Sequence, residues 1–222
     1  MPKVVDHEQR RREIVDAVLR VVVRDGAAGA SVRTVAAEAG WSTGAVRHYF
    51  ATQRELREFA ARTVTERVGT RIRAYIAEHE FVLPLPELAA RILEHLIPLD
   101  DQRREEYQLW LAIGEWSRQN DLEESARMWA EQRDMYLQIV YRLSGYPNEP
   151  VPAENLDPRV AAWAEYLHVF VDGLAAQAMF VPDDMPPERV RTVLRAFLAE
   201  VPSLADEPPP ADRSRPVGDG AG

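Results

Sequence analysis

The segment from Ser31 to Phe50 gathers side chains that can hydrogen-bond to DNA bases or phosphates. Thr43, Arg47 and His48 recur at spacings that place them on one outer face of a helix, and such groups pair with base edges and phosphate oxygens in a major groove. Hydroxyls and free N–H groups at the start of the preceding helical pattern suit a phosphate. The predicted DNA contacts are Ser31, Arg33, Thr34, Thr43, Arg47, His48, Tyr49 and Thr52.

The elements that position these side chains are short helices. Ser31 caps a predicted helix whose apolar face holds Val32, Val35, Ala36 and Ala39, and Gly40-Trp41-Ser42 joins it to a second helix ending at Phe50. Glycine accepts the positive φ of such a turn. An earlier apolar stripe at helical spacing can pack against the pair, and residues 1–12 before it, with Arg10, Arg11 and Arg12, are expected to be a flexible arm. Periodicity alone does not distinguish a DNA-binding helix-turn-helix from an ordinary helical hairpin.

The stretch TVAAEAGWSTGAVRHYFATQRELREFA resembles the N-terminal signature of the TetR family of bacterial repressors, notably at Ala36, Gly40, Gly44, His48-Tyr49-Phe50 and Leu56. The STG…HYF form and the closing stretch VDGLAAQAMF…PPERVRTVLRAFL are similar to the branch that includes the choline-responsive repressor of betaine synthesis. Gln53 stands where the family often has lysine, and Val46-Arg47 replaces a common Leu-Tyr pair. The resemblance implies a repressor that a small organic molecule releases from its double-stranded operator DNA.

The whole chain is predicted to be all-α. Helices are expected at about 53–80, 86–97, 101–118, 121–144, 158–180 and 186–201, and a Pro- and Gly-rich tail from Pro202 is expected to be disordered. We therefore predict a helix-turn-helix domain over 1–52, a ligand-binding and dimerisation domain over 53–201, and a tail over 202–222.

Charge and composition narrow the class of protein. The net charge is −9, but residues 1–50 carry eight Lys or Arg against six Asp or Glu, so the local balance there is positive. The sequence shows no signal peptide, no membrane-spanning stretch and no cysteine, which predicts a cytoplasmic protein without membrane association or disulfides.

Aromatic residues concentrate in the predicted ligand-binding domain. Core packing explains any single ring, whereas the resemblance implies a pocket between helices, and aromatic faces with a carboxylate would suit a cation. Asp172 is a further candidate polar anchor. The predicted ligand contacts are Tyr107, Trp110, Glu115, Trp116, Trp129, Tyr136, Phe170 and Gln177.

Two other features of the sequence bear on its function. Glu165 and His168 form a single Glu-x-x-His pair, whereas a di-iron bundle enzyme needs two, so we predict no enzyme, metal or cofactor. A helical scaffold without DNA function stays open at this point. The last two predicted helices present an apolar stripe and a small-residue surface, and the resemblance implies a homodimer there, through Gly173, Ala176, Val190, Leu194 and Phe197.

Overall fold

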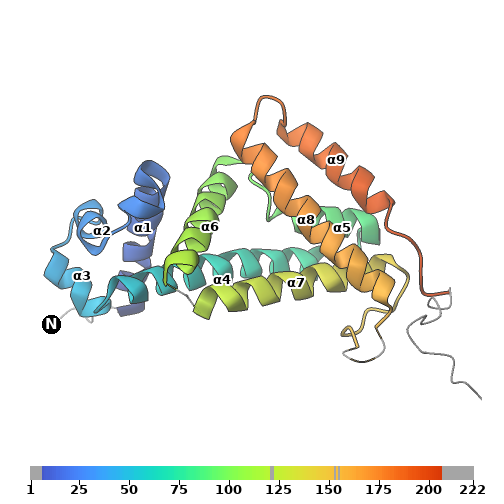
Figure 1. The fold of residues 1–222 in the computed structure, drawn as a ribbon, viewed down its shortest axis with the longest axis horizontal. Helices are drawn as coiled ribbons and strands as arrows, with labels where there is room; N and C mark the ends of the chain where they lie inside the picture. The colour runs from blue at the N-terminus through green and yellow to red at the C-terminus, as the bar shows by residue number, and fades with distance from the viewer. Residues whose placement is uncertain (1–6, 121–122, 153, 155, 207–222) are drawn as a thin grey trace, which may run out of the picture.

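Apolar stripes at helical spacing, separated by turns, build the chain (Figure 1). The computed structural model describes residues 7–120, 123–152, 154 and 156–206, and within them it has helices and no strand, which confirms the all-α prediction. The helices are α1 (His7–Gly29), α2 (Val32–Glu38), α3 (Thr43–Tyr49), α4 (Gln53–His79), α5 (Leu85–Glu94), α6 (Asp101–Asn120), α7 (Glu123–Leu143), α8 (Pro158–Phe180) and α9 (Pro187–Ala199).

Side-chain caps and one glycine fix the head formed by α1, α2 and α3. The Ser31 hydroxyl accepts the Thr34 backbone N–H, and the Thr34 hydroxyl accepts the Ser31 N–H, so a reciprocal box starts α2. The Ser42 hydroxyl caps α3 by accepting the Ala45 N–H. Thr52 and Glu55 form a second reciprocal box at the start of α4. Gly40 turns the chain between α2 and α3 with a φ of 70°. These local signals explain why the helix boundaries could be predicted from the sequence.

The interior holds two hydrophobic cores. The head core joins α1, α2, α3 and the first half of α4 to α6, which contributes Leu109, Ile113 and Trp116. The second core joins α5, α7, α8 and α9 to Ile72 of α4. Apolar packing therefore runs continuously past residue 52, because α4 and α6 both reach from the head into the rest of the molecule (Figure 1).

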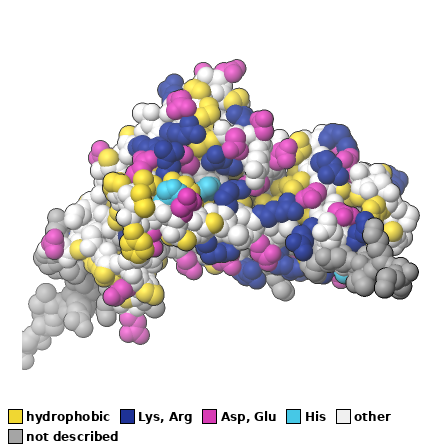
Figure 2. Space-filling model, turned by 180° about the vertical axis from the view of Figure 1, so that it is seen from behind, with side chains coloured by type: hydrophobic (Ala, Val, Ile, Leu, Met, Phe, Trp, Pro, Cys, Tyr) yellow, Lys and Arg dark blue, Asp and Glu magenta, His cyan; other side chains and the backbone are white. Residues whose placement is uncertain are grey.

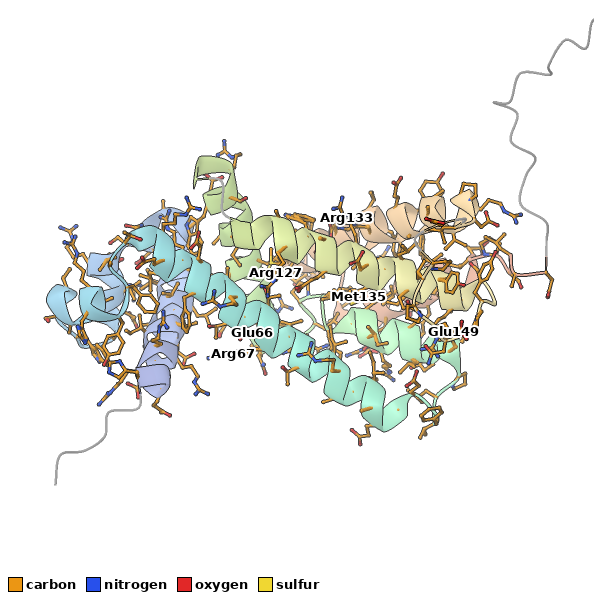
Figure 3. All side chains as sticks on the ribbon, turned by 90° about the horizontal axis from the view of Figure 1, so that it is seen from below. Glu66, Arg67, Arg127, Arg133, Met135 and Glu149 are labelled. Atoms are coloured by element: carbon orange, nitrogen blue, oxygen red, sulfur yellow. The ribbon has the colours of Figure 1, made fainter. Side chains whose placement is uncertain are left out.

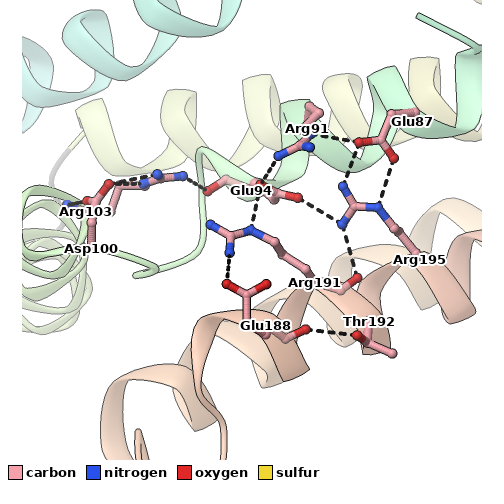
Figure 4. A network of polar contacts seen from close by, with 9 residues as sticks. All are labelled: Glu87, Arg91, Glu94, Asp100, Arg103, Glu188, Arg191, Thr192 and Arg195. Carbon is pink, nitrogen blue, oxygen red and sulfur yellow. Dashed lines mark hydrogen bonds and ion pairs between the residues drawn. The ribbon is translucent and has the colours of Figure 1, made fainter.

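An ion-pair network holds α5 against α9 (Figure 4). Glu94 of α5 is only 4% exposed and lies among Arg91, Arg191 and Arg195. Arg195 also pairs with Glu87 at 2.7 Å, and that guanidinium lowers the pKa of the Glu87 carboxyl. The three guanidinium groups together compensate the buried Glu94 carboxylate, and two of them come from α9, so the network stabilises the α5–α9 pairing.

Both ends of the described chain depart from the sequence prediction. Residues 7–12 are helical rather than a flexible arm, because Arg10 pairs with Glu13 at 2.9 Å along α1. Beyond α9, Leu204 is 3% exposed, and the backbone N–H groups of residues 204 and 205 donate to the Ser144 carbonyl at 2.8 and 3.0 Å. The tail is thus tied down through these residues, while 1–6 and 207–222 lie outside the described residues.

Candidate DNA-binding surface and ligand pocket

One face of α3 carries the residues predicted to read bases. Val46 is fully buried in the head core, and this fixes the rotation of the helix so that Arg47 and His48 are exposed on its outer side. Thr43 is partly exposed in the first turn. Tyr49 is half-buried, with its ring 5.6 Å from Trp41. All four side chains predicted on this helix are therefore at least partly accessible.

The predicted phosphate contacts lie at the helix starts beside α3. Thr34 is engaged within the head, since its hydroxyl donates to the Gly29 carbonyl at 2.6 Å as well as closing the Ser31 box. Arg33, between them, is exposed. Thr52 is exposed at the start of α4, where its hydroxyl accepts the Glu55 N–H at 3.1 Å. Backbone N–H groups and the Arg33 side chain are thus the groups best placed for an anion at these turns.

Two arginines of α1 lie on aromatic rings of the head. The Arg10 guanidinium is 5.3 Å from the Trp41 ring centre, and the Arg11 guanidinium is 4.4 Å from that of Phe59. Such cation–π contacts help to fix the position of a guanidinium at the surface, in addition to the ion pair of Arg10 with Glu13. Seen from behind, basic and acidic side chains are interspersed over the molecule (Figure 2).

A cavity of about 410 Å³ lies between α4, α6 and α7, with α8 beside it. Tyr107, Trp110 and Tyr136 line it, and the Tyr107 and Trp110 rings stack at 5.7 Å. Seen from below, Glu66 of α4 and Arg127 and Met135 of α7, which also line it, lie along the space between these two helices (Figure 3). The apolar part of its wall consists of Val64, Val68, Ile72, Ile113, Met128, Met135, Val171 and Ala175.

Two of the charged residues that line the cavity, Glu106 and Arg103, are paired with neighbouring side chains. Arg71 reaches Glu106 with two hydrogen bonds of 2.8 and 2.7 Å, and its Nε–H donates to His95 Nδ1 at 3.2 Å. His95 must be neutral to accept there, and burial, followed by the charges of Arg71 and Arg103, lowers its pKa. Arg103 is bound to Asp100 at 2.7 Å.

Asp172 has a different environment from the other acids of the cavity. Its carboxylate lies 3.4 Å from His168 Nε2 and is 34% exposed. Burial raises its pKa, and burial together with the charge of Asp172 raises the pKa of Tyr107. An acid in partly apolar surroundings next to aromatic rings is stabilised in its charged form by a nearby cation.

Comparison with known families decides the class of protein. Residues 14–59 match the family of bacterial regulatory proteins called tetR, and residues 86–202 match the BetI-type transcriptional repressor C-terminal family. The chain belongs to the TetR family. This regulator is accordingly a DNA-binding transcription factor of the BetI-type branch rather than an enzyme.

Some relatives match the regulator over most of its length. It is 36% identical over 202 residues to the HTH-type transcriptional regulator PksA of Bacillus subtilis strain 168, covering 90% of this chain and 94% of PksA. A transcriptional regulator from Rhodococcus sp. Rha1 has 26% identity and a TM-score of 0.71, over 86% of this chain and 95% of that one. The multidrug binding protein EbrR, solved with malachite green, has 28% identity and a TM-score of 0.57, over 85% and 98%.

Only part of the predicted ligand set lines the regulator's cavity. Tyr107, Trp110 and Tyr136 do so, and Glu115, Trp116, Trp129, Phe170 and Gln177 do not. Trp116 is 1% exposed in the head core, and Glu115 pairs with Arg118 on the outer side of α6. Trp129 packs edge-on behind Trp110, Phe170 stacks on Phe197 and Gln177 is exposed. Aromatic content could not separate the cavity wall from core and surface.

Residues on α4 were missed because their role depends on tertiary packing. Val64, Val68 and Ile72 read as ordinary core positions in the sequence, yet they line one wall of the cavity. Arg71 belongs to no local sequence motif, because its partners His95 and Glu106 lie 24 and 35 residues further along the chain. Only the helical spacing of the three apolar residues was available as a signal.

The predicted dimer residues divide into two groups. Val190 and Leu194 are fully buried within the protomer, so they belong to its core and cannot form a surface contact. Gly173 is exposed, and Ala176 and Phe197 are partly exposed. The outer face of α8 also exposes apolar side chains that the prediction left out: Tyr166, Val169 and Phe180.

Neither a metal centre nor a membrane span is found in the described part of the regulator. Among those residues, no three His, Asp or Glu side chains gather closely enough to hold a metal ion. Glu165 is exposed, whereas its partner in the Glu-x-x-His pair, His168, lies beside Asp172. No described helix is long and apolar enough to cross a bilayer.

Proposed function

We propose that this regulator binds operator DNA as a homodimer through α3 and is released when an organic cation occupies the cavity between α4, α6 and α7. The observation that carries the proposal is the position of the cavity. Two of the helices that line it, α4 and α6, also contribute side chains to the head core. Any ligand that changes the separation of α4 and α6 therefore acts on the elements that hold the DNA-binding head.

The α3 surface supports base reading. Arg47 can form a bidentate contact with guanine, His48 and Thr43 can bond base edges or phosphates, and Tyr49 stands at the end of the same helix. Arg33 at the start of α2 and Thr52 at the start of α4 flank it, with helix N-termini that favour phosphate. We assign DNA recognition to residues 7–52 and ligand binding to the helices that follow.

The cavity's chemistry favours an aromatic cation. Tyr107, Trp110 and Tyr136 line the cavity, where aromatic rings can attract positive charge, and Asp172 supplies a carboxylate whose printed contact is His168. Arginines line the cavity as well, and two of them, Arg103 and Arg127, are paired with Asp100 and Glu131. EbrR, whose solved complex contains the cationic dye malachite green, offers a parallel in a related protein. A ligand acts as inducer only if it binds the DNA-free conformation better than the DNA-bound one.

The α8 face supports a homodimer. Val169, Tyr166 and Phe180 are 75%, 57% and 66% exposed, which is unusual for large apolar side chains, and Gly173 between them allows close approach of a second α8. A two-fold contact would bury the same residues of both copies and set the spacing of the two α3 helices at about one DNA turn, ~34 Å.

The experiment measures operator binding with and without a cation. A DNA duplex is selected from random sequence by the protein, and its affinity is measured by fluorescence anisotropy in the presence of tetraphenylphosphonium. We expect the affinity to fall about 5- to 150-fold at saturation. The uncharged triphenylphosphine oxide is the matched ligand control and should act far more weakly. Failure of both tetraphenylphosphonium and malachite green to bind, or binding without release of DNA, would overturn the proposal of a cationic inducer.

A further inference from the structure

The C-terminal end of α1 is broken at Gly26, which has a φ of 72° and a ψ of −177°. The break interrupts the helical hydrogen-bond ladder, so nearby carbonyls become available to other elements. Three of them accept side-chain donors from three different helices. The Ala27 carbonyl accepts the Trp116 indole N–H of α6 at 3.0 Å, the Gly29 carbonyl accepts the Thr34 hydroxyl of α2 at 2.6 Å, and the Ala30 carbonyl accepts the Gln53 amide of α4 at 3.0 Å.

This segment, residues 26–30, is a junction between the head and the helices of the cavity. Thr34 belongs to the box that starts α2, so a shift of the Gly29 carbonyl would disturb the helix that positions α3. The junction is also the place where Gln53 departs from the lysine common in the family, and in this chain its amide serves an internal contact.

The tryptophan at the junction continues a row of residues from the cavity. Tyr107, Trp110 and Ile113 line the cavity at three-residue steps along α6, and Trp116 is the next step. Its indole is 1% exposed in the head core, and the Arg57 guanidinium of α4 lies 4.9 Å over the ring. A rotation or translation of α6 that accommodates a ligand at Trp110 therefore moves Trp116 against α1, because a helix transmits such a motion along its axis.

We propose that Trp116 is a positioning residue that conveys the state of the cavity to the DNA-binding head through its hydrogen bond to the Ala27 carbonyl. The inference rests on the proposed function and names the contacts that connect the cavity to the head. The route runs along α6 into α1, which shares more of its packing with α6 than with α4. Ligand binding displaces α6, and the indole N–H either leaves the Ala27 carbonyl or pulls that carbonyl along. The end of α1 then moves, and the start of α2 and α3 shift with α1.

The test is Trp116→Phe, which removes the donor and keeps an aromatic ring in the core. Trp163→Phe on α8 is the matched control, since the Trp163 ring contacts those of Tyr166 and Phe197 and lies off the proposed route. Three quantities are measured for each protein: the tetraphenylphosphonium affinity, the operator affinity without ligand, and the operator affinity at ligand saturation. We expect Trp116→Phe to bind tetraphenylphosphonium like the wild type, while its ligand-induced loss of operator affinity is smaller by about threefold to tenfold, the effect of one lost hydrogen bond.

The outcomes separate this inference from the proposed function. If Trp116→Phe is folded and shows the same ligand-induced loss of operator affinity as the wild type, the route through Trp116 is wrong although the regulator is ligand-responsive. A simple loss of stability would lower the melting temperature and leave that ratio unchanged, which also counts against the route. If tetraphenylphosphonium does not release the wild type, the proposed inducer class fails instead.

A second measurement does not depend on a ligand or on the folding of Trp116→Phe. By linkage, a contact that responds to the ligand also responds to operator DNA. The chain has five tryptophans, so the indole N–H resonance of Trp116 can be assigned by elimination from Phe variants of the other four. We expect this resonance to shift and its solvent exchange to slow when the operator binds. An unchanged resonance and exchange rate in the complex would overturn the proposal.

Discussion

Asp172→Asn changes the charge of the cavity and almost nothing else. The two side chains have the same shape, and Asp172 is 34% exposed beside His168, so the substitution removes a negative charge without creating a void. The structure predicts weaker binding of tetraphenylphosphonium and little change in the binding of triphenylphosphine oxide, because only the charged ligand gains from the carboxylate.

The magnitude follows from the position of the carboxylate. A cation about 5 Å from it is attracted by about 3 kcal/mol at an effective dielectric constant of about 20. The exposed third of the side chain and the neighbouring His168 reduce this to about 1–2 kcal/mol, which corresponds to a loss of about 5- to 30-fold in affinity. Glu131→Gln removes a charge from an exposed lining residue of the same cavity and should change the affinity by less than about twofold.

The assay is isothermal titration calorimetry between pH 5 and 8. Burial raises the pKa of Asp172, and cation affinity should increase as the pH rises through that raised pKa and then level off. The dependence should be lost in Asp172→Asn. If Asp172→Asn and Glu131→Gln bind tetraphenylphosphonium equally well, the carboxylate is not the partner of the ligand and the argument for a cation fails.

Four further outcomes are expected. Arg47→Ala should weaken operator binding by about 1–3 kcal/mol and relax sequence preference at one position, while Arg118→Ala, the loss of an exposed arginine on α6, should not; equal affinities in a gel-shift titration would mean that α3 is misplaced on the DNA. Val169→Asp should give monomers in sedimentation velocity and abolish tight operator binding, while Val82→Asp, at 74% exposure in the turn after α4, stays dimeric; a dimeric Val169→Asp would remove α8 from the interface. Because the folded-state pKa of His95 is lowered, the unfolded chain binds this proton more readily, so stability should be full above the ordinary histidine pKa and decrease as pH falls below it; a urea midpoint independent of pH from 5 to 8 would contradict this. Arg195→Met should lower the unfolding free energy by about 1–2 kcal/mol, because Glu94 and Glu87 each lose one arginine partner and keep another, and an unchanged urea midpoint would show that Arg195 contributes nothing to the α5–α9 network.

The sequence predicted the head well because its signals are local. Ser31, Gly40, Ser42 and Thr52 act within four residues of their own position, as caps or as a turn, and the structure uses each one in this way. The outward direction of Arg47 followed from the buried side of the same short helix. At the C-terminal end the prediction failed because a distant contact, that of Leu204 with Ser144, holds the chain in place.

The cavity could be predicted only in part because its walls come from distant segments. Tyr107, Trp110 and Tyr136 line it, but Trp116, three residues from another lining position, turns into the head core because α1 lies there. Helical spacing gives the angle between two side chains on one helix and not the identity of the neighbouring helix. For the same reason Val190 and Leu194 were assigned to an interface although α5 and α8 cover them.

The central claim is that the cavity controls operator binding, and a single titration tests it most directly. Labelled operator duplex is bound by the wild-type protein at a concentration near the dissociation constant, and tetraphenylphosphonium is added while the fluorescence anisotropy is followed. We expect release of the DNA along a curve whose midpoint matches the calorimetric ligand affinity after correction for linkage, and a curve displaced to higher ligand concentration for Asp172→Asn. Calorimetric binding of tetraphenylphosphonium with no release of DNA at saturation would contradict the claim.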